Sequence, residues 1–459
     1  MSSSGSGEIL VVPKNAQGHL FPCVELCKHL ISRNYNITFI VDSDITSSIP
    51  SSLLQSPLFQ LTLDSLDALL TTRRHPPPVC AIVDHIINKT THQLFSKFAI
   101  PTLVFITSGA CWAAVQHAVW MIRPGDMIPG EVRALPGLPE ELVFKYSDLK
   151  QRRHWMPPPR KQEGQGGRGR GGGGPRGPPL PGEPAPWVEE VESSAAILIN
   201  TCDDLERPFL DYVAHLTGKP VWGVGPLLPD QFWQPSDSLF LLRDREIRPK
   251  KESNYTEDQV IEWLDQQPRG SVMFVSFGSE VGPTVEEYPE LAKALEEWTG
   301  SFIWVIQRKS GHPGGSDYFP HGLDEKVGKK GLIIHGWAPQ LLILSHRSTG
   351  GFVSHCGWNS TVEAIVRGVP LLAWPIRGDQ YYNAMLVVNH LKVGTMVSEN
   401  YPADLVTKDD ILGGMERVLT DKDIRKQSDI LRGKFEQGFP PSSLASLDAF
   451  TDFINHKAA

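Results

Sequence analysis

The chain has 459 residues, of which 40% are hydrophobic and 21% charged, and its formal net charge is −8. This length exceeds one ordinary hydrophobic core and predicts two domains. The acidic balance argues against a general nucleic-acid-binding protein, and no apolar run reaches the ~18 residues that a membrane span needs, so no integral membrane protein is expected.

The N-terminus and the cysteines indicate where the protein is found. MSSSGSGEILVVP lacks the basic region and the long apolar core of a signal peptide. Six cysteines are scattered along the chain: Cys23, Cys27, Cys80, Cys111, Cys202 and Cys356. This scatter favours reduced thiols over a disulfide framework. We therefore expect a cytoplasmic protein, and we expect it to be a monomer.

Short apolar runs alternate with helix-like segments in the first half of the chain. Residues 20–34 carry apolar side chains at helical spacing. The expected strands are EILVVP (8–13), NITFIVD (36–42), VCAIVD (79–84), PTLVFIT (101–107) and AAILINT (195–201). Such alternation predicts an α/β fold with a parallel sheet.

A glycine- and arginine-rich stretch at about 160–182 interrupts this order. An RNA-binding segment is one interpretation of such a composition. No aromatic residues for base stacking are interleaved, so we favour a solvated mobile loop.

A second α/β series begins after a loosely patterned stretch. The expected helices are 255–268 and 285–298, and the expected strands are 271–279, 302–307, 331–337, 349–355 and 370–375. Residues 443–454 predict a last amphipathic helix with Ser443 as its N-cap. The predicted division is a domain at 1–225, a linker at 226–253, a domain at 254–440 and a final helical segment at 441–459.

The stretch GGFVSHCGWNSTVEAIVRGVP, residues 350–370, passes from a strand into a helix. Its turn therefore lies at the carboxyl edge of a sheet, where open α/β folds bind ligands. The free N–H groups and positive dipole end of a helix N-terminus attract phosphate. The competing interpretation is a metal site at His355 and Cys356. Adjacent side chains diverge, and no CxxC or HxxxH accompanies them, so the phosphate site is favoured.

Two further patterns lie in the first half. Asp42 and Asp44 have the Asp-X-Asp spacing of a divalent-ion site, but they read more simply as a polar loop after a strand. His19, in the loop KNAQGH, lies at the junction of the first strand and the first helix. The residues alone leave a catalytic and a structural role for His19 equally open.

Residues 337–380 read WAPQLLILSHRSTGGFVSHCGWNSTVEAIVRGVPLLAWPIRGDQ. This stretch closely resembles the donor-binding box of the plant family 1 UDP-glycosyltransferases, and the resemblance extends to VSFGS and to the GH loop near the N-terminus. It implies the GT-B fold, in which two Rossmann-like domains with parallel sheets face each other across a cleft and the last helix returns to the N-terminal domain. The implied activity is the inverting transfer of glucose from UDP-glucose to a hydroxyl of a small phenolic acceptor, without a metal or other cofactor. Flavonoids are the first class of acceptor that we expect.

The resemblance also implies roles for individual residues. The implied donor contacts are Trp337, Ala338, Gln340 and Glu363 for the nucleoside, Ser279, His355, Asn359 and Ser360 for the diphosphate, and Thr107, Trp358, Asp379 and Gln380 for the sugar. Gln at the last position of the box is associated in this family with glucose, and His with galactose. Glucose is therefore the expected sugar.

By the same resemblance His19 is the general base, and Asp84 orients its imidazole. The helix N-terminus behind His19 is expected to disfavour the imidazolium form and keep the ring available as a base. Asp84 could instead be a helix N-cap. The chain also departs from the family pattern, because only 65 positions separate the two residues. We therefore expect this stretch to lack a strand or helix that helps to line the acceptor pocket in the family. The alternatives are C-glycosylation of the same acceptors, a non-catalytic UDP-sugar-binding protein, or an RNA-associated protein.

Overall fold

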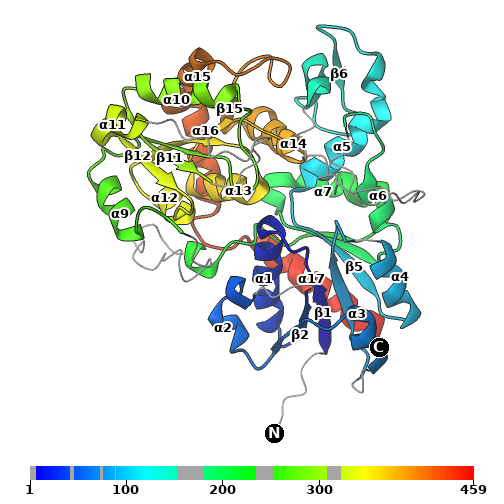
Figure 1. Cartoon of the computed structure of the whole chain (residues 1–459). Helices are drawn as coiled ribbons and strands as arrows, with labels where there is room; N and C mark the ends of the chain where they lie inside the picture. The colour runs from blue at the N-terminus through cyan, green and yellow to red at the C-terminus, as the bar shows by residue number, and fades with distance from the viewer. Residues whose placement is uncertain are drawn as a thin grey trace, which may run out of the picture.

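The computed structural model describes residues 7–41, 46–72, 76–87, 89–151, 180–233, 252–307 and 322–458. Asp42 and Asp44, nearly all of the glycine- and arginine-rich stretch and most of the predicted linker lie outside these ranges. The described part forms two α/β lobes (Figure 1).

The N-terminal lobe is built on a seven-stranded parallel sheet with the strand order β3-β2-β1-β4-β5-β8-β9. Its strands are β1 (Glu8–Val12), β2 (Asn36–Ile40), β3 (Phe59–Thr62), β4 (Cys80–Asp84), β5 (Thr102–Ile106), β8 (Ala196–Ile199) and β9 (Val221–Gly223). Its helices are α1 (Gln17–Ile31), α2 (Ser51–Leu54), α3 (Leu66–Thr72), α4 (Lys89–Lys97), α5 (Ala110–Ile122), α6 (Pro186–Val191) and α7 (Asp203–Thr217). A separate antiparallel pair is formed by β6 (Val132–Ala134) and β7 (Val143–Lys145).

Both faces of this sheet are covered, which is why its central strands read as unbroken apolar runs. In β4 all five residues are buried. Ile82 packs in a core cluster with residues of α1, whereas Ala81 and Val83 pack in another cluster with residues of α3 and α4.

The C-terminal lobe holds a six-stranded parallel sheet with the order β12-β11-β10-β13-β14-β15. Its strands are β10 (Val272–Ser276), β11 (Ser301–Ile306), β12 (Gly331–His335), β13 (Thr349–Ser354), β14 (Leu371–Ala373) and β15 (Gly394–Met396). Its helices are α9 (Glu257–Asp265), α10 (Glu287–Glu297), α11 (Leu323–Val327), α12 (Gln340–Ser345), α13 (Trp358–Arg367), α14 (Gln380–Met385), α15 (Lys408–Thr420) and α16 (Lys422–Lys434).

The strand order of each sheet determines where its ligand edge lies. In both sheets the first strand in sequence pairs on one side with the second and on the other with a later strand, β4 in one case and β13 in the other. The order reverses at these pairs, and open α/β sheets bind ligands at the carboxyl ends of such pairs. The chain segments that leave β1, β4, β10 and β13 are therefore the ones that can form a site.

The last helix, α17 (Pro441–Ala458), lies against the N-terminal lobe, as its red ribbon beneath that lobe shows (Figure 1). Asp448 on this helix pairs with Arg33 at 2.7 Å, and the Tyr35 hydroxyl donates to Asn455 Oδ1 at 2.9 Å. The ring of Phe453 meets that of Trp222 edge to face. The final segment of the chain thus joins the two lobes.

One expectation about local structure is wrong. The last helix begins at Pro441, before Ser443, and the Ser443 hydroxyl donates to the carbonyl of Gly225 instead of capping the helix. The stretch between His19 and Asp84 contains a strand that was not predicted, β3, which pairs with β2 at the sheet edge.

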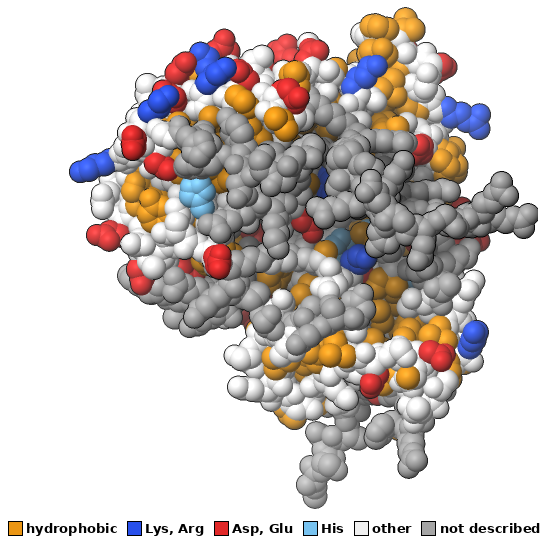
Figure 2. Space-filling model, in the orientation of Figure 1, with side chains coloured by type: hydrophobic (Ala, Val, Ile, Leu, Met, Phe, Trp, Pro, Cys, Tyr) orange, Lys and Arg blue, Asp and Glu red, His pale blue; other side chains and the backbone are white. Residues whose placement is uncertain are grey.

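The described residues contain no helix that is long and apolar enough to cross a membrane. On the face shown in Figure 2, acidic and basic side chains of the described residues are interspersed and form no continuous basic patch. All six cysteines are buried and unpaired.

Candidate active site

A cavity of about 780 Å³ opens between the lobes, at the ligand edges of both sheets. It is lined by the loop after β1, by α5 and α6, and by the segments that follow β10, β12, β13 and β14. The predicted site residues that line it are His19, Thr107, Ser279, Trp337, Ala338, Gln340, His355, Trp358, Asn359, Ser360, Glu363, Asp379 and Gln380. Asp84 is the one predicted residue that does not line the cavity.

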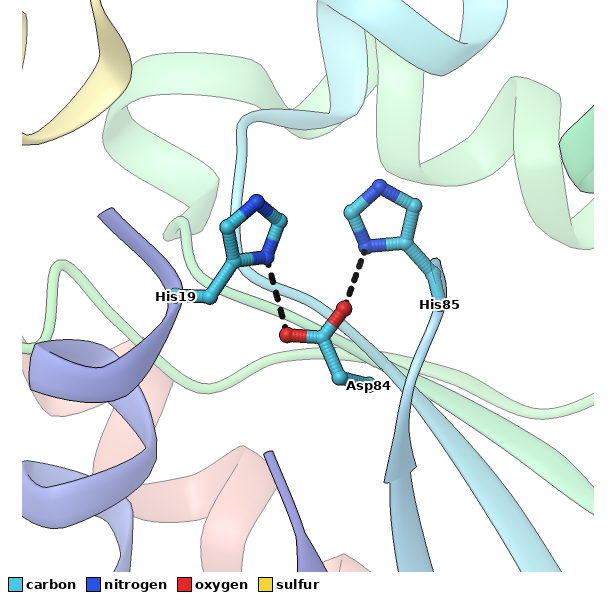
Figure 3. A group of neighbouring side chains, drawn as sticks. All are labelled: His19, Asp84 and His85. Atoms are coloured by element: carbon cyan, nitrogen blue, oxygen red, sulfur yellow. Dashed lines mark hydrogen bonds and ion pairs between the residues drawn. The ribbon is translucent and has the colours of Figure 1, made fainter. Parts of the chain in front are cut away.

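Asp84 lies next to His19, because β1 and β4 are paired neighbours whose carboxyl ends meet. The His19 Nδ1 and the Asp84 Oδ2 are 2.9 Å apart (Figure 3). The other carboxylate oxygen accepts the backbone N–H of Ile86 at 3.1 Å, and Asp84 is only 1% exposed. The carboxylate is therefore fixed on one side of the imidazole, and the Nε2 of His19 points away from it.

The pKa of the His19 imidazole is raised, contrary to the sequence expectation. Burial lowers this pKa, but the hydrogen bond and the charge of Asp84, together with the charges of Asp379 and Glu280, outweigh burial. The expectation considered only the partial charge of the nearby helix end. A full carboxylate charge at hydrogen-bond distance in a buried position is the larger effect. In turn, His19 lowers the pKa of Asp84 against the opposing effect of burial.

Thr107 contacts His19 as well as lining the cavity. Its Oγ1 is 2.9 Å from the His19 Nδ1, the same nitrogen that faces Asp84. The next residue, Ser108, reaches across the cleft, and its hydroxyl donates to Asp379 Oδ2 at 2.8 Å. Ser108 was not predicted, although its position after β5 at the same sheet edge could have indicated it.

Glu206 fixes the helix that follows this pair. Its two carboxylate oxygens accept the N–H groups of Ala110 and Cys111, at 2.8 and 2.7 Å, at the start of α5. Glu206 is completely buried. A carboxylate brought from α7 thus satisfies the first free donors of α5 and fixes the loop that carries Thr107 and Ser108.

On the opposite wall, the N-terminus of α13 opens into the cavity. Its N-cap is Gly357, which has no side chain to cap the N–H groups of the first turn. The preceding Cys356 has a φ of 60°, which turns the chain sharply from β13 into the helix. Burial, with the nearby charge of Arg377, lowers the pKa of His355 to about 4. His355 is therefore a neutral imidazole beside a helix end that attracts anions.

The residues expected at the nucleoside and the sugar are held by specific contacts. The Gln340 amide donates to Ser360 Oγ at 3.0 Å and to Glu363 Oε2 at 2.7 Å. The Gln380 Oε1 accepts the N–H groups of Ile376 and Arg377, each at 3.0 Å. This orientation leaves the Gln380 amide N–H₂ to donate to a ligand.

Trp358 also joins the lobes. Its indole N–H donates to the carbonyl of Asn200 at 2.7 Å, and the side chain is 4% exposed. The Asn359 amide donates to the Gly18 carbonyl at 3.4 Å. The first residues of α13 thus lie directly against the loop that carries His19.

His85 is the functional candidate that sequence reasoning missed. It directly follows Asp84, is 6% exposed and lines the cavity. Its Nδ1 lies 3.4 Å from Asp84 Oδ1, so the carboxylate has an imidazole on each side (Figure 3). Within the described ranges, His19, Asp84 and His85 are the only group of three His, Cys or carboxylate side chains with the spacing of a metal site. His355 and Cys356 belong to no such group.

Comparison with known proteins identifies the family of the chain. A family model described as UDP-glucoronosyl and UDP-glucosyl transferase matches residues 248–433. Mogroside IIIx synthase from Siraitia grosvenorii is 32% identical over 456 residues, which cover 94% of this chain and 90% of the relative. UDP-glucosyl transferase 73M2 from Saponaria officinalis is 31% identical over 398 residues, covering 84% and 74%. The chain belongs to the plant family 1 UDP-glycosyltransferases.

A solved structure agrees on the fold. The UDP-glycosyltransferase UGT71G1 from Medicago truncatula, determined with UDP-glucose, aligns over 98% of each chain with a TM-score of 0.74 and 23% identity. The chain therefore has the GT-B fold that the donor box implied. Its membership of the family makes it an enzyme that uses a UDP-sugar.

Proposed function

We propose that this glycosyltransferase moves glucose from UDP-glucose to a hydroxyl of a small phenolic acceptor, with His19 as the general base and Asp84 as its partner. The observation that carries the proposal is the hydrogen bond of 2.9 Å between the His19 Nδ1 and Asp84, beside a cavity whose other wall is the free N-terminus of α13. One wall offers a base and the other an anion site.

In the proposed reaction the acceptor O–H gives its proton to the Nε2 of His19. The acceptor oxygen forms a bond to the anomeric carbon of the sugar while the bond from that carbon to the UDP oxygen breaks. The electron pair of the broken bond leaves with UDP, and the configuration at the carbon inverts. Asp84 stabilises the imidazolium that forms, as a buried carboxylate does for a catalytic histidine.

On the donor side, we assign the diphosphate to the first turn of α13, with Ser279, His355, Asn359 and Ser360. Free N–H groups at a helix N-terminus stabilise the negative charge that grows on the departing UDP. We assign the uracil to the face of Trp337 and the ribose to Glu363, which Gln340 holds in place. No metal ion is assigned to this proposed mechanism.

The acceptor assignment rests on the remaining wall of the cavity. Phe21, Ile86, Trp112 and Trp187 line it. Flat aromatic and apolar side chains favour a planar aromatic ligand through stacking and burial of its rings. Phenolic acceptors fit this lining, and their hydroxyl needs the base that His19 supplies.

The test is an assay of the recombinant protein with UDP-glucose and a panel of small phenols, read by mass spectrometry. We expect a mass gain of one hexose on at least one phenol, and a yield of that product lower by roughly 10²-fold or more with His19→Ala. Acid hydrolysis of the product distinguishes an O-glucoside, which is cleaved, from a C-glucoside, which is not. No transfer to any phenol would contradict the acceptor assignment.

The donor assignment is tested at Gln380. Its carbonyl is occupied by two backbone N–H groups, so its N–H₂ is free to donate to a sugar hydroxyl. Glucose and galactose differ in the direction of one hydroxyl. We expect Gln380→His to lower the ratio of kcat/KM for UDP-glucose over UDP-galactose by about 10- to 100-fold, the value of ~1–3 kcal/mol for one buried hydrogen bond. Gln266→His, at the exposed end of α9, should leave the ratio unchanged.

A further inference from the structure

We propose that His85 is a second acceptor-binding imidazole, which selects acceptors with two adjacent hydroxyl groups. This inference rests on the proposed transfer to phenols and names the class of phenol. His19 takes the proton of the hydroxyl that attacks the sugar, and His85 accepts a hydrogen bond from the adjacent hydroxyl of the same acceptor. The favoured acceptors are therefore catechols and compounds that contain a catechol ring.

The first argument is the placement of the ring. His85 directly follows Asp84, the last residue of β4, and it lines the cavity that His19 also lines. The two imidazole centroids are 5.7 Å apart with their planes 31° from parallel. In Figure 3 the two rings flank the Asp84 carboxylate, and the Nε2 of each ring points away from it. The two Nε2 atoms are therefore turned in the same direction.

The second argument is the protonation of His85. Burial, together with the charge of His19, lowers its pKa to about 4 despite the opposing charge of Asp84. The ring is therefore neutral when His19 is active. A neutral ring whose Nδ1 carries its hydrogen toward the carboxylate has a lone pair on Nε2. Such a nitrogen accepts a hydrogen bond from a hydroxyl.

The third argument is that the structure gives His85 little hydrogen bonding of its own. At 3.4 Å, its Nδ1 is in ion-pair range of Asp84, and it has no hydrogen-bond partner of good geometry among the described residues. Burying a polar group without such a partner is unfavourable, so a ligand that hydrogen-bonds to His85 would offset part of this cost.

The fourth argument is distance. Adjacent hydroxyl oxygens on an aromatic ring lie about one hydrogen-bond length apart, ~2.8 Å, and two hydrogen bonds of that length can spread outward from them. Two such hydrogen bonds can join the two hydroxyl oxygens to the nitrogens of two imidazoles whose centroids are as far apart as those of His19 and His85. Trp112 continues the wall, with its ring centroid 5.1 Å from that of His85. A catechol ring can therefore lie against this wall with its two oxygens facing the two imidazoles.

The experiment compares 4-methylcatechol with 4-methylphenol, which lacks the second hydroxyl, as acceptors for UDP-glucose. We expect the wild-type enzyme to prefer the catechol by about 10-fold or more in kcat/KM, the value of one buried hydrogen bond. His85→Phe keeps a ring but removes both nitrogens, and it should lower this preference about 10-fold. His85→Gln, which restores an acceptor atom, should recover part of the preference.

His92→Phe is the matched control, because His92 is also buried in the N-terminal lobe but does not line the cavity. It should leave the preference unchanged. Thermal unfolding midpoints and UDP affinity verify that each variant is folded.

An unchanged preference in His85→Phe would overturn the inference while leaving the transfer to phenols standing. If the rates with both acceptors fall equally in this variant, His85 acts only through Asp84 on the base. If the wild-type enzyme glucosylates neither phenol, the acceptor assignment itself fails, and the inference fails with it.

Discussion

Asp84→Asn is the substitution that most directly tests the proposed base. The amide keeps the size of the side chain but removes its charge at 2.9 Å from the His19 Nδ1. Asp84 is 1% exposed, so water does not screen this charge. The substitution should therefore act on His19 without opening the cavity.

The magnitude follows from the contact that is lost. A hydrogen bond to a charged group contributes ~1.5–3 kcal/mol, and the imidazolium that needs it exists only once the acceptor proton has moved. Losing this stabilisation in the transition state lowers kcat about 10- to 150-fold. The pH dependence should change as well. The base form of His19 is present only above its pKa, which Asp84 raises, so activity falls as pH decreases through that value. Without the carboxylate charge the pKa falls, and the acid limb moves to lower pH.

The assay is kcat and kcat/KM against pH with one phenolic acceptor and saturating UDP-glucose. Asp148→Asn, which alters a carboxylate outside the cavity, serves as the control and should keep the wild-type profile. The reasoning is refuted if Asp84→Asn keeps the wild-type plateau, or if its plateau drops while the acid limb stays in place. The second result would mean that Asp84 is structural and does not set the protonation of the base.

Three further outcomes are expected. His19→Ala should lower turnover roughly 10²-fold or more and leave UDP affinity, measured by calorimetry, near wild type; equal turnover would exclude His19 as the base. Activity should survive EDTA, and loss that Zn²⁺ restores would mean that the imidazole–carboxylate cluster holds a metal. Glu206→Ala leaves two buried N–H groups at the start of α5 without acceptors. The free energy of unfolding, measured by denaturant titration, should therefore fall by ~2–5 kcal/mol. Glu416→Ala, on the exposed face of α15, should change it little.

The strands that line the site were predictable because they are buried on both faces. Such strands read as continuous apolar runs, and the residues after them must lie at one edge. β3 was not predicted, since its four residues, FQLT, are too few and too mixed in polarity to stand out at the edge of a sheet. The donor wall was predictable from one continuous stretch, whose position before a helix determines its geometry.

The electrostatics were less accessible to sequence. The pKa of His19 depends on a carboxylate 65 positions away, and only the pairing of β1 with β4 brings the two together. His85 follows Asp84 directly, yet sequence alone does not reveal that its ring turns toward the same cavity. Contacts across the cleft, such as that of Ser108 with Asp379, depend on how two separately folded sheets meet.

The packing of α17 has a consequence for biosynthesis. Leu447, Phe450 and Ile454 belong to the same buried cluster as residues of β1, β2 and β4. The ribosome makes those strands first and this helix last, with the whole C-terminal lobe in between. At the usual speed of translation the interval is on the order of ten seconds or more. During that time the nascent N-terminal lobe exposes an apolar face that only the end of the chain can cover. A protein truncated shortly before its C-terminus would therefore keep every residue of the cavity and still leave its first-made core open to water and to chaperones.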